Sequence, residues 1–202
     1  MTAARRWACV VLGVLLLVVT PVLLRAVPVS DARLSAPALL QRVEQARDRG
    51  YSGYVETVGA VGLPENAQLS GLTALVGDTN RLRVWWRDPG TWRVATLRTT
   101  GETDLFHARH RTLRWEYESK DVTVVPDVPV RLPFTSDLLP PELARRVLAG
   151  ARPAELRRIP ARRVAGREAL GLRLRPADPG ASIARVDVYA DASTGLPLQV
   201  EM

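Results

Sequence analysis

The sequence predicts an α+β fold in which helices cover the concave face of a large, curved antiparallel sheet, with a transmembrane helix in front of it. Three observations support this prediction. An uncharged apolar run lies near the N-terminus, many short alternating strands are joined by brief turns, and two segments have the caps and apolar stripe of amphipathic helices. The 202 residues provide enough chain for one domain and an N-terminal appendage.

The N-terminal run is long enough to cross a bilayer. Residues 1–6 contain Arg5 and Arg6, and residues 7–24 follow without a charge before Arg25. This predicts a cytoplasmic segment 1–6, a transmembrane signal anchor 7–24 and a linker 25–34. A cleaved signal peptide is the alternative. In both cases residues 35–202 would form an extracytoplasmic domain. If the anchor is retained, a single transmembrane pass would hold this domain at the cytoplasmic membrane.

The first helix of the domain is expected to begin after Ser35, an N-cap residue, with Pro37 in its first turn, and to end at Gly50. Its apolar residues recur at helical spacing and share one face, which is expected to lie on the sheet. These residues are Leu39, Leu40, Val43 and Ala46.

The strands follow in rapid succession. Leu82, Val84 and Trp86 alternate with charged or exposed neighbours, and Asp88-Pro89-Gly90 supplies a turn. Connections this short force neighbouring strands to be antiparallel, so a meander is expected. Its strands are predicted at 51–58, 81–87, 91–98, 103–108, 112–118 and 121–125, with a loop at 59–66 and a short helix or ragged strand at 69–76.

The proline-rich segment 126–141 cannot form a central strand, because too many backbone N–H groups are missing, and is predicted to be a crossing loop. A helix is expected from Pro140 to Gly150 with Leu143, Val147 and Leu148 facing inward. Strands are predicted at 155–165, 169–175 and 184–190, then a turn at 191–195 near which Asp187 and Asp191 act as caps, and a last strand at 196–202. That strand reaches the final residue, which fits either a truncated chain or an isolated first domain.

Composition argues against nucleic-acid binding. The net charge is +7, but 27 of the 28 basic residues are arginines scattered over every segment, which indicates a bias in codon usage more than a binding patch. The single cysteine, Cys9, lies at the start of the apolar run, so neither a disulfide framework nor a lipobox is predicted.

No constellation of residues predicts catalysis, a cofactor or a metal. His107 and His110 are the only histidines, and a zinc site needs at least one further ligand. The sequence has neither a Gly-x-Ser-x-Gly elbow nor a phosphate-binding glycine loop between a strand and a helix. Glu116 and Glu118 are expected on an outward face. A non-enzymatic protein is therefore predicted, and a hydrolase or metal enzyme that uses the two histidines is the alternative from another class.

The aromatic load of the meander has to lie in a core or in a groove, and a half-barrel with one or two helices over its concave face can keep an apolar interior for an acyl chain. The candidate groove residues on the strands are Leu82, Val84, Trp86, Trp92, Val94 and Trp115, with Leu39, Val43 and Leu143 from the covering helices. Each of these residues also fits an ordinary filled core.

Five short stretches occur in a characteristic order, at residues 51–53, 81–85, 92–94, 186–191 and 194–198. Their order and spacing resemble the LolA/RseB-like family, which includes periplasmic lipoprotein carriers and the MucB/RseB N-terminal domain of sensors that control an anti-sigma factor. The resemblance covers residues 36 to 202 and is greatest to membrane-anchored actinobacterial members. It implies an unclosed barrel of eleven strands, with helices plugging the concave side, and binding of lipid or lipoprotein acyl chains without catalysis.

Two departures from the family bear on the function. Its carriers are soluble, whereas this chain has a predicted tether, and its sensors have a second domain for which 202 residues leave no room. We therefore expect a membrane-tethered module that binds lipid, acyl chains or a lipidated partner in envelope-stress regulation, with an anti-sigma factor as a candidate partner. A lipid or lipoprotein carrier and a partner-docking domain without a cavity are the alternatives.

Overall fold

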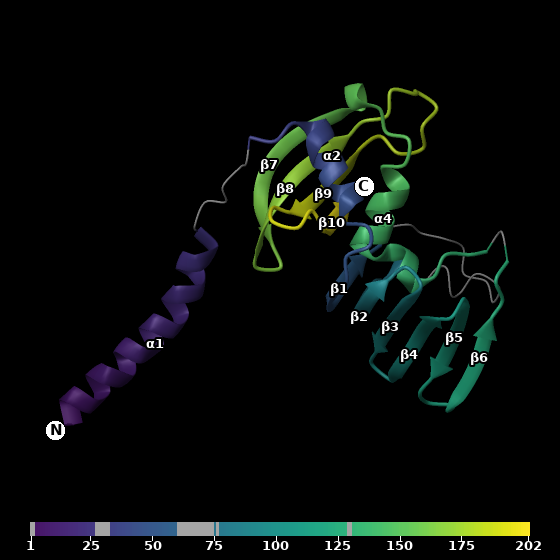
Figure 1. Cartoon of the computed structure of the whole chain (residues 1–202). Coiled ribbons are helices and arrows are strands. Elements are labelled where there is room, and N and C mark those ends of the chain that lie inside the picture. The colour runs from purple at the N-terminus through teal and green to yellow at the C-terminus, as the bar shows by residue number, and fades with distance from the viewer. Residues whose placement is uncertain (1–2, 27–32, 60–74, 76, 129–130) are drawn as a thin grey trace.

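The computed structural model describes residues 3–26, 33–59, 75, 77–128 and 131–202. Figure 1 shows an N-terminal helix, two antiparallel sheets and two further helices, α2 and α4. The predicted α+β class is confirmed, as is an antiparallel sheet that does not close into a barrel. The predicted loop 59–66 and the ambiguous segment 69–76 lie outside the described residues, apart from Gly59 and Leu75.

Helix α1 (Ala3–Ala26) contains the predicted anchor. Its segment Ala3–Thr20 is long and apolar enough to cross a membrane, and that segment is not buried against the rest of the chain. A signal sequence near an N-terminus has the same properties, so the length and composition of α1 fit both a membrane anchor and a signal sequence.

The meander forms a six-stranded sheet in which every strand pairs with the one before it, as the short turns predicted. In the first turn, Oδ1 of Asp88 accepts a hydrogen bond from the backbone N–H of Gly90 at 2.9 Å. The strands are β1 (Tyr51–Val58), β2 (Thr79–Asp88), β3 (Thr91–Arg98), β4 (Gly101–Ala108), β5 (Arg111–Glu116) and β6 (Asp121–Val125).

The strands after the proline-rich crossing form a second sheet of four strands, in the order β10-β9-β8-β7. These strands are β7 (Leu156–Val164), β8 (Arg167–Leu174), β9 (Val186–Asp191) and β10 (Pro197–Glu201). The segment between the sheets contributes a 3-10 turn, η1 (Thr135–Leu138), and no strand among its described residues, because its prolines cannot donate to a ladder. A short 3-10 turn, η2 (Pro153–Glu155), leads into β7. The single sheet expected from the sequence is thus divided at this crossing.

Helix α2 (Ala36–Gln45) is capped as predicted, because Oγ of Ser35 accepts a hydrogen bond from the backbone N–H of Ala38. It ends at Gln45, earlier than the predicted Gly50. Gly50 has a different role: a Cβ there would lie 3.1 Å from the carbonyl oxygen of Arg87, so glycine lets the chain pass close to the end of β2.

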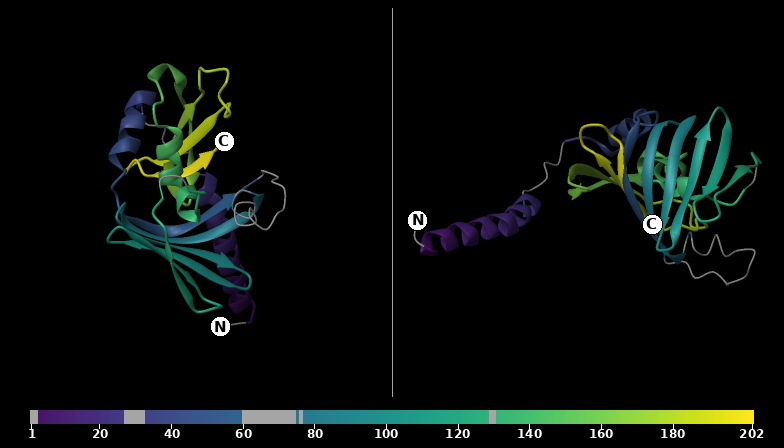
Figure 2. Two further views of the ribbon diagram at one scale, coloured as in Figure 1. Left: turned by 90° about the vertical axis from the view of Figure 1, so that its right-hand side faces the viewer. Right: turned by 90° about the horizontal axis from the view of Figure 1, so that it is seen from below.

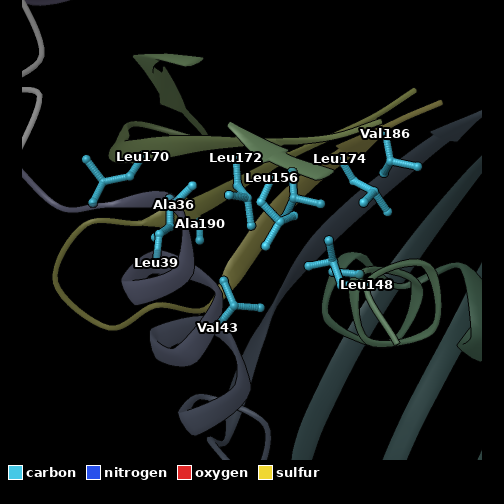
Figure 3. Packing of buried hydrophobic residues seen from close by; sticks show 12 residues of the cluster. Ala36, Leu39, Val43, Leu148, Leu156, Leu170, Leu172, Leu174, Val186 and Ala190 are labelled. Atoms are coloured by element: carbon cyan, nitrogen blue, oxygen red, sulfur yellow. The ribbon is translucent and has the colours of Figure 1, made fainter. Parts of the chain in front are cut away.

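Two separate cores hold the domain together. The larger one lies between the four-stranded sheet, α2 and α4 (Pro140–Val147), and Figure 3 shows its side chains meeting from these three sides. It consists of Ala36, Leu39, Val43, Ala144, Leu148, Leu156, Leu170, Leu172, Leu174, Val186, Val188 and Ala190. The smaller core lies on the six-stranded sheet and contains Leu82, Val84, Trp86, Val94 and Leu139. Both helices and the four-stranded sheet lie on the same side of the six-stranded sheet (Figure 2).

Candidate functional site

The six-stranded sheet has an inner face, which carries Leu82, Val84 and Trp86, and an outer face, which carries the alternating residues of each strand. The register pairs Trp86 with Trp92 and Val84 with Val94. The structure therefore brings five of the nine predicted groove residues together on the inner face. Leu82, Val84 and Val94 have almost no exposed surface and pack against Leu139, so the middle of this face is filled.

The other four predicted residues lie elsewhere. Val94 pairs with Leu105 and Leu105 pairs with Arg114, so Arg114 lies on the inner face and Trp115 on the outer face. Hydrophobicity alone suggested the reverse orientation for Trp115. The alternation within β5 does not say which of its faces is the inner one, and only the pairing with β4 and β3 fixes that. Leu39 and Val43 of α2 pack in the larger core, against the four-stranded sheet, and Leu143 is half-buried on α4.

One end of the inner face carries a row of stacked rings. Tyr51, Trp86, Trp92 and His107 lie side by side on four strands, with centroid separations of 5.9, 5.5 and 5.2 Å and nearly parallel planes. Burial, with a further contribution from the Glu142 carboxylate on α4, raises the pKa of Tyr51. The row forms one end of the smaller core, on the side where Glu142 of α4 lies near Tyr51.

His107 belongs to this row and lies beside Thr112. Its Nδ1 lies 2.9 Å from Oγ1 of Thr112, and burial, together with His110, lowers its pKa. His110 lies in the β4–β5 turn with a positive φ of 62°. Within the described ranges, no three His, Cys, Asp or Glu side chains come close enough to hold a metal ion.

The opposite end of the inner face has a hollow of about 470 Å³ next to η1. Leu105 and Phe134 contribute apolar walls, and the guanidinium groups of Arg114 and Arg131 lie 5.8 and 4.5 Å from the centre of the Phe134 ring. Charged residues make up much of the remaining lining: Arg98, Glu102, Arg114, Glu116 and Glu118. This hollow is too polar to be a site for a purely apolar chain.

A second hollow lies between α2 and α4, and we call it the helix cleft. Its volume is about 410 Å³. Apolar side chains from both helices and from β10 form its walls, and ionic side chains form its rim. The walls include Leu40, Val43, Ala46, Pro141, Ala144, Leu148, Ala149 and Pro197, and the rim has Glu44, Arg47, Glu142 and Arg145.

Of the nine predicted groove residues only Val43 lines the helix cleft. The sequence did contain a signal for two further residues of the cleft, since Leu40 and Leu148 were expected on the apolar faces of their helices. That signal does not show that the two apolar stripes leave space between them, because the distance between α2 and α4 depends on how each packs on the second sheet.

No protein-family model and no curated protein sequence matches the chain. Among solved structures, it is similar to a conserved protein of Thermus thermophilus with 14% identity and a TM-score of 0.44, over 82% of this chain and 74% of that one. It is similar to a LolA superfamily protein of Nitrosomonas europaea with 13% identity and a TM-score of 0.31, over 81% and 69% of the two chains.

A third similar structure is an outer membrane lipoprotein-sorting protein domain of Vibrio parahaemolyticus, with 16% identity and a TM-score of 0.31, over 83% and 70% of the two chains. All three TM-scores are below 0.5, so membership of a family is not established by them. The chain is an α+β protein with an apolar N-terminal helix, and its structural neighbours include LolA-superfamily proteins.

Proposed function

We propose that the chain is a non-enzymatic, membrane-tethered extracytoplasmic module that binds a lipid, an acyl chain or a lipidated partner in the helix cleft. The observation that carries this proposal is the cleft itself, with its apolar walls and ionic rim. Its volume of about 410 Å³ lies in the ordinary range for small-molecule sites, roughly 300–1,000 Å³.

The cleft suits an amphiphile. Each methylene group transferred from water to apolar surroundings contributes about 0.8 kcal/mol, so five of them would supply ~4 kcal/mol along the walls. At the rim, Glu142 and Arg145 form an ion pair at 2.8 Å, and Glu44 and Arg47 lie on α2. The rim can therefore receive a polar headgroup while the walls receive the chain.

Filling the cleft is expected to abolish this binding. Ala149 is an exposed wall residue of the cleft, so Ala149→Trp fills the cleft without opening a core. The measurement is cross-linking of a diazirine-bearing fatty acid to the full chain in lipid nanodiscs, with mapping by mass spectrometry. We expect peptides of α2 and α4 to be labelled in the unsubstituted chain and at least about tenfold less in the variant, which is a loss of roughly 1.4 kcal/mol.

Two controls make this result specific. Ala181→Trp places the same ring at an exposed loop position outside the cleft and is expected to leave the labelling unchanged. Labelling of α1 serves as an internal reference within each sample. Equal labelling of α2 and α4 in both variants would show that the cleft is not the site.

The tether is part of the proposal: residues 1–6 cytoplasmic, 7–24 a transmembrane signal anchor, 25–34 a linker and 35–202 the extracytoplasmic domain. Helix α1 supports it by length and composition. Intact-mass analysis of the chain purified from bacterial membranes is expected to find an N-terminus at residue 1 or 2. A mature N-terminus between residues 27 and 33 would contradict the anchor and leave export intact.

Within this function, we propose a role in envelope-stress regulation, with an anti-sigma factor as partner, in preference to lipoprotein carriage. A chain fixed in one membrane by α1 cannot move to another, and this supports a sensor over a shuttle. Transfer of a fluorescent lipid from chain-bearing nanodiscs to acceptor vesicles tests the choice. Transfer that depends on the helix cleft would favour the carrier.

A further inference from the structure

The outer face of the six-stranded sheet carries two cross-strand rows in which aromatic and arginine side chains are neighbours. The register places Arg83 beside Tyr54, and Arg93 between Trp85 and Phe106. The first row is Tyr54, Arg83, Ala95, Asp104, Trp115 and Val122, and the second is Ser52, Trp85, Arg93, Phe106, Leu113 and Val124.

Large apolar side chains of this face are exposed to solvent. The exposed fractions are 72% for Tyr54, 59% for Val122, 60% for Val124 and 62% for Tyr117, which follows β5. Helices α2 and α4 lie on the opposite side of the sheet (Figure 2). The exposed side chains lie toward both edges of the sheet, with Trp85, 39% exposed, between them, and exposed apolar residues that share one face indicate an interaction surface.

The arginines hold the rings in place. The guanidinium of Arg93 lies 4.6 Å from the Trp85 ring and 5.1 Å from the Phe106 ring, and that of Arg83 lies 5.2 Å from the Tyr54 ring. Arg93 also donates to Asp104 at 2.7 Å, and Asp104 has no exposed surface. This face therefore presents ordered rings and cationic groups, with one of its carboxylates withdrawn beneath them.

The net charge of the face is slightly positive. By register it carries four arginines, at 81, 83, 93 and 111, and three carboxylates, Glu56, Glu102 and Asp104, so 4 − 3 = +1, and Arg87 and Asp88 at the β2–β3 bulge balance each other. Tyrosine and tryptophan rings favour the region between lipid headgroups and acyl chains, and arginine side chains can reach the headgroups above it. The rings and valines would supply most of the affinity, and the arginines a preference for anionic headgroups.

If α1 spans a bilayer, the short linker keeps the whole domain close to that bilayer. Eight residues, 27–34, lie between Ala26 and Ser35, which makes nine Cα–Cα steps (35 − 26 = 9) of about 3.4 Å when extended, so Ser35 stays within roughly 30 Å of the end of α1. Such a tether raises the effective concentration of the bilayer far above that of a freely diffusing partner.

We propose that the outer face of the six-stranded sheet docks on the headgroup region of an anionic lipid bilayer. This inference rests on the proposed tether and is independent of the helix cleft. Docking would leave α2 and α4, which lie on the other side of the sheet, accessible from the aqueous side.

The test uses the full chain with Cys9→Ser, in nanodiscs that contain phosphatidylglycerol. Ser52→Cys places a fluorophore on the outer face, and Ser182→Cys places the same fluorophore at an exposed position in the loop before β9. Lipids with a nitroxide on the headgroup are expected to quench the probe at 52 several-fold more strongly than the probe at 182. Equal quenching at both positions overturns the proposal.

Two variants examine the chemistry of docking. Arg83→Glu is expected to shift the docking equilibrium by fivefold or more, because one basic residue near an anionic surface contributes about fivefold, and Trp85→Ser by about tenfold. Arg157→Glu, an exposed arginine on β7, is the matched control and should change nothing. The substitution at 83 keeps the test valid if the one at 85 disturbs folding.

The remaining outcomes are distinguishable. Energy transfer between chains labelled at 52, without quenching by lipid, would identify a second copy as the occupant and overturn the proposal. Quenching at 52 together with a failed fatty-acid labelling of α2 and α4 would remove only the helix cleft. Loss of the chain from the nanodiscs through cleavage after α1 would remove the tether, and the docking proposal with it.

Discussion

Replacing Leu139 with alanine is expected to lower the free energy of unfolding by about 2–5 kcal/mol, the usual cost of truncating a buried leucine. Leu139 has no exposed surface and packs on Leu82, Val84 and Val94 of the inner face. It extends from the proline-rich crossing into the smaller core, so its loss leaves a cavity between the crossing and the sheet. Urea unfolding of the full chain in detergent, followed by tryptophan fluorescence, measures the change, because Trp86 belongs to this core.

Leu132→Ala is the matched control for Leu139→Ala. Leu132 belongs to the same crossing but is 55% exposed, so its truncation is expected to change the free energy of unfolding by less than about 0.5 kcal/mol. Similar losses for both variants would mean that the crossing does not pack on the sheet as described.

Replacing Asp191 with asparagine is expected to cost about 3 kcal/mol at neutral pH, because the charge of a buried carboxylate is removed while Arg167, its ionic partner, stays. Asp191 ends β9, and its carboxylate accepts hydrogen bonds from Arg167 and from the backbone and hydroxyl groups of Ser193 and Thr194. The turn that it organises packs on α2: Arg42 donates to the carbonyl oxygen of Ala192 at 2.8 Å. Thermal unfolding by circular dichroism measures the loss.

The cost of Asp191→Asn is expected to depend on pH. Burial alone would raise the pKa of Asp191, but the hydrogen bonds from Arg167, Ser193 and Thr194 outweigh it and hold this pKa well below its usual range. A carboxyl whose pKa is lower in the folded state stabilises the fold above its unfolded pKa of about 3.9, and the contribution disappears as the pH falls through the folded value.

The unfolding temperatures of the unsubstituted chain and of Asp191→Asn should therefore differ at pH 7 and converge as the pH falls from about 4 toward 2. Some acid sensitivity should remain in the variant, because Arg173 likewise lowers the pKa of Asp187. A difference between the two chains that stays constant over this range would show that the Asp191 carboxylate is not stabilised by its partners.

Much of the fold could be predicted from local patterns. The strand Tyr51–Val58 has the predicted bounds, and β3 and β6 have the predicted residues as well. Alternation with a period of two and the turn chemistry at Asp88 are properties of a few neighbouring residues, so one sequence is sufficient to recognise them. The predicted capping role of Asp191 follows from the same local chemistry.

The candidate site could not be predicted as well. Trp115 belongs to a cleanly alternating strand, yet its face depends on the pairing of β4 with β5. Leu39 and Val43 form the expected apolar stripe, but they pack against the second sheet, away from the tryptophans with which they were grouped. Gly50 ends no helix and instead allows a close approach to β2, a requirement that arises only when the two segments meet.

The sequence by itself therefore determined the apolar N-terminal helix, the order of the strands and the apolar stripes of α2 and α4, because each depends on residues a few positions apart. Only the tertiary structure decided that the middle of the inner face is filled by Leu139, that the helix cleft stays open and that aromatic residues remain exposed on the outer face. These outcomes depend on contacts between distant segments, since apolar side chains are alike in the sequence and differ only in whether another element covers them.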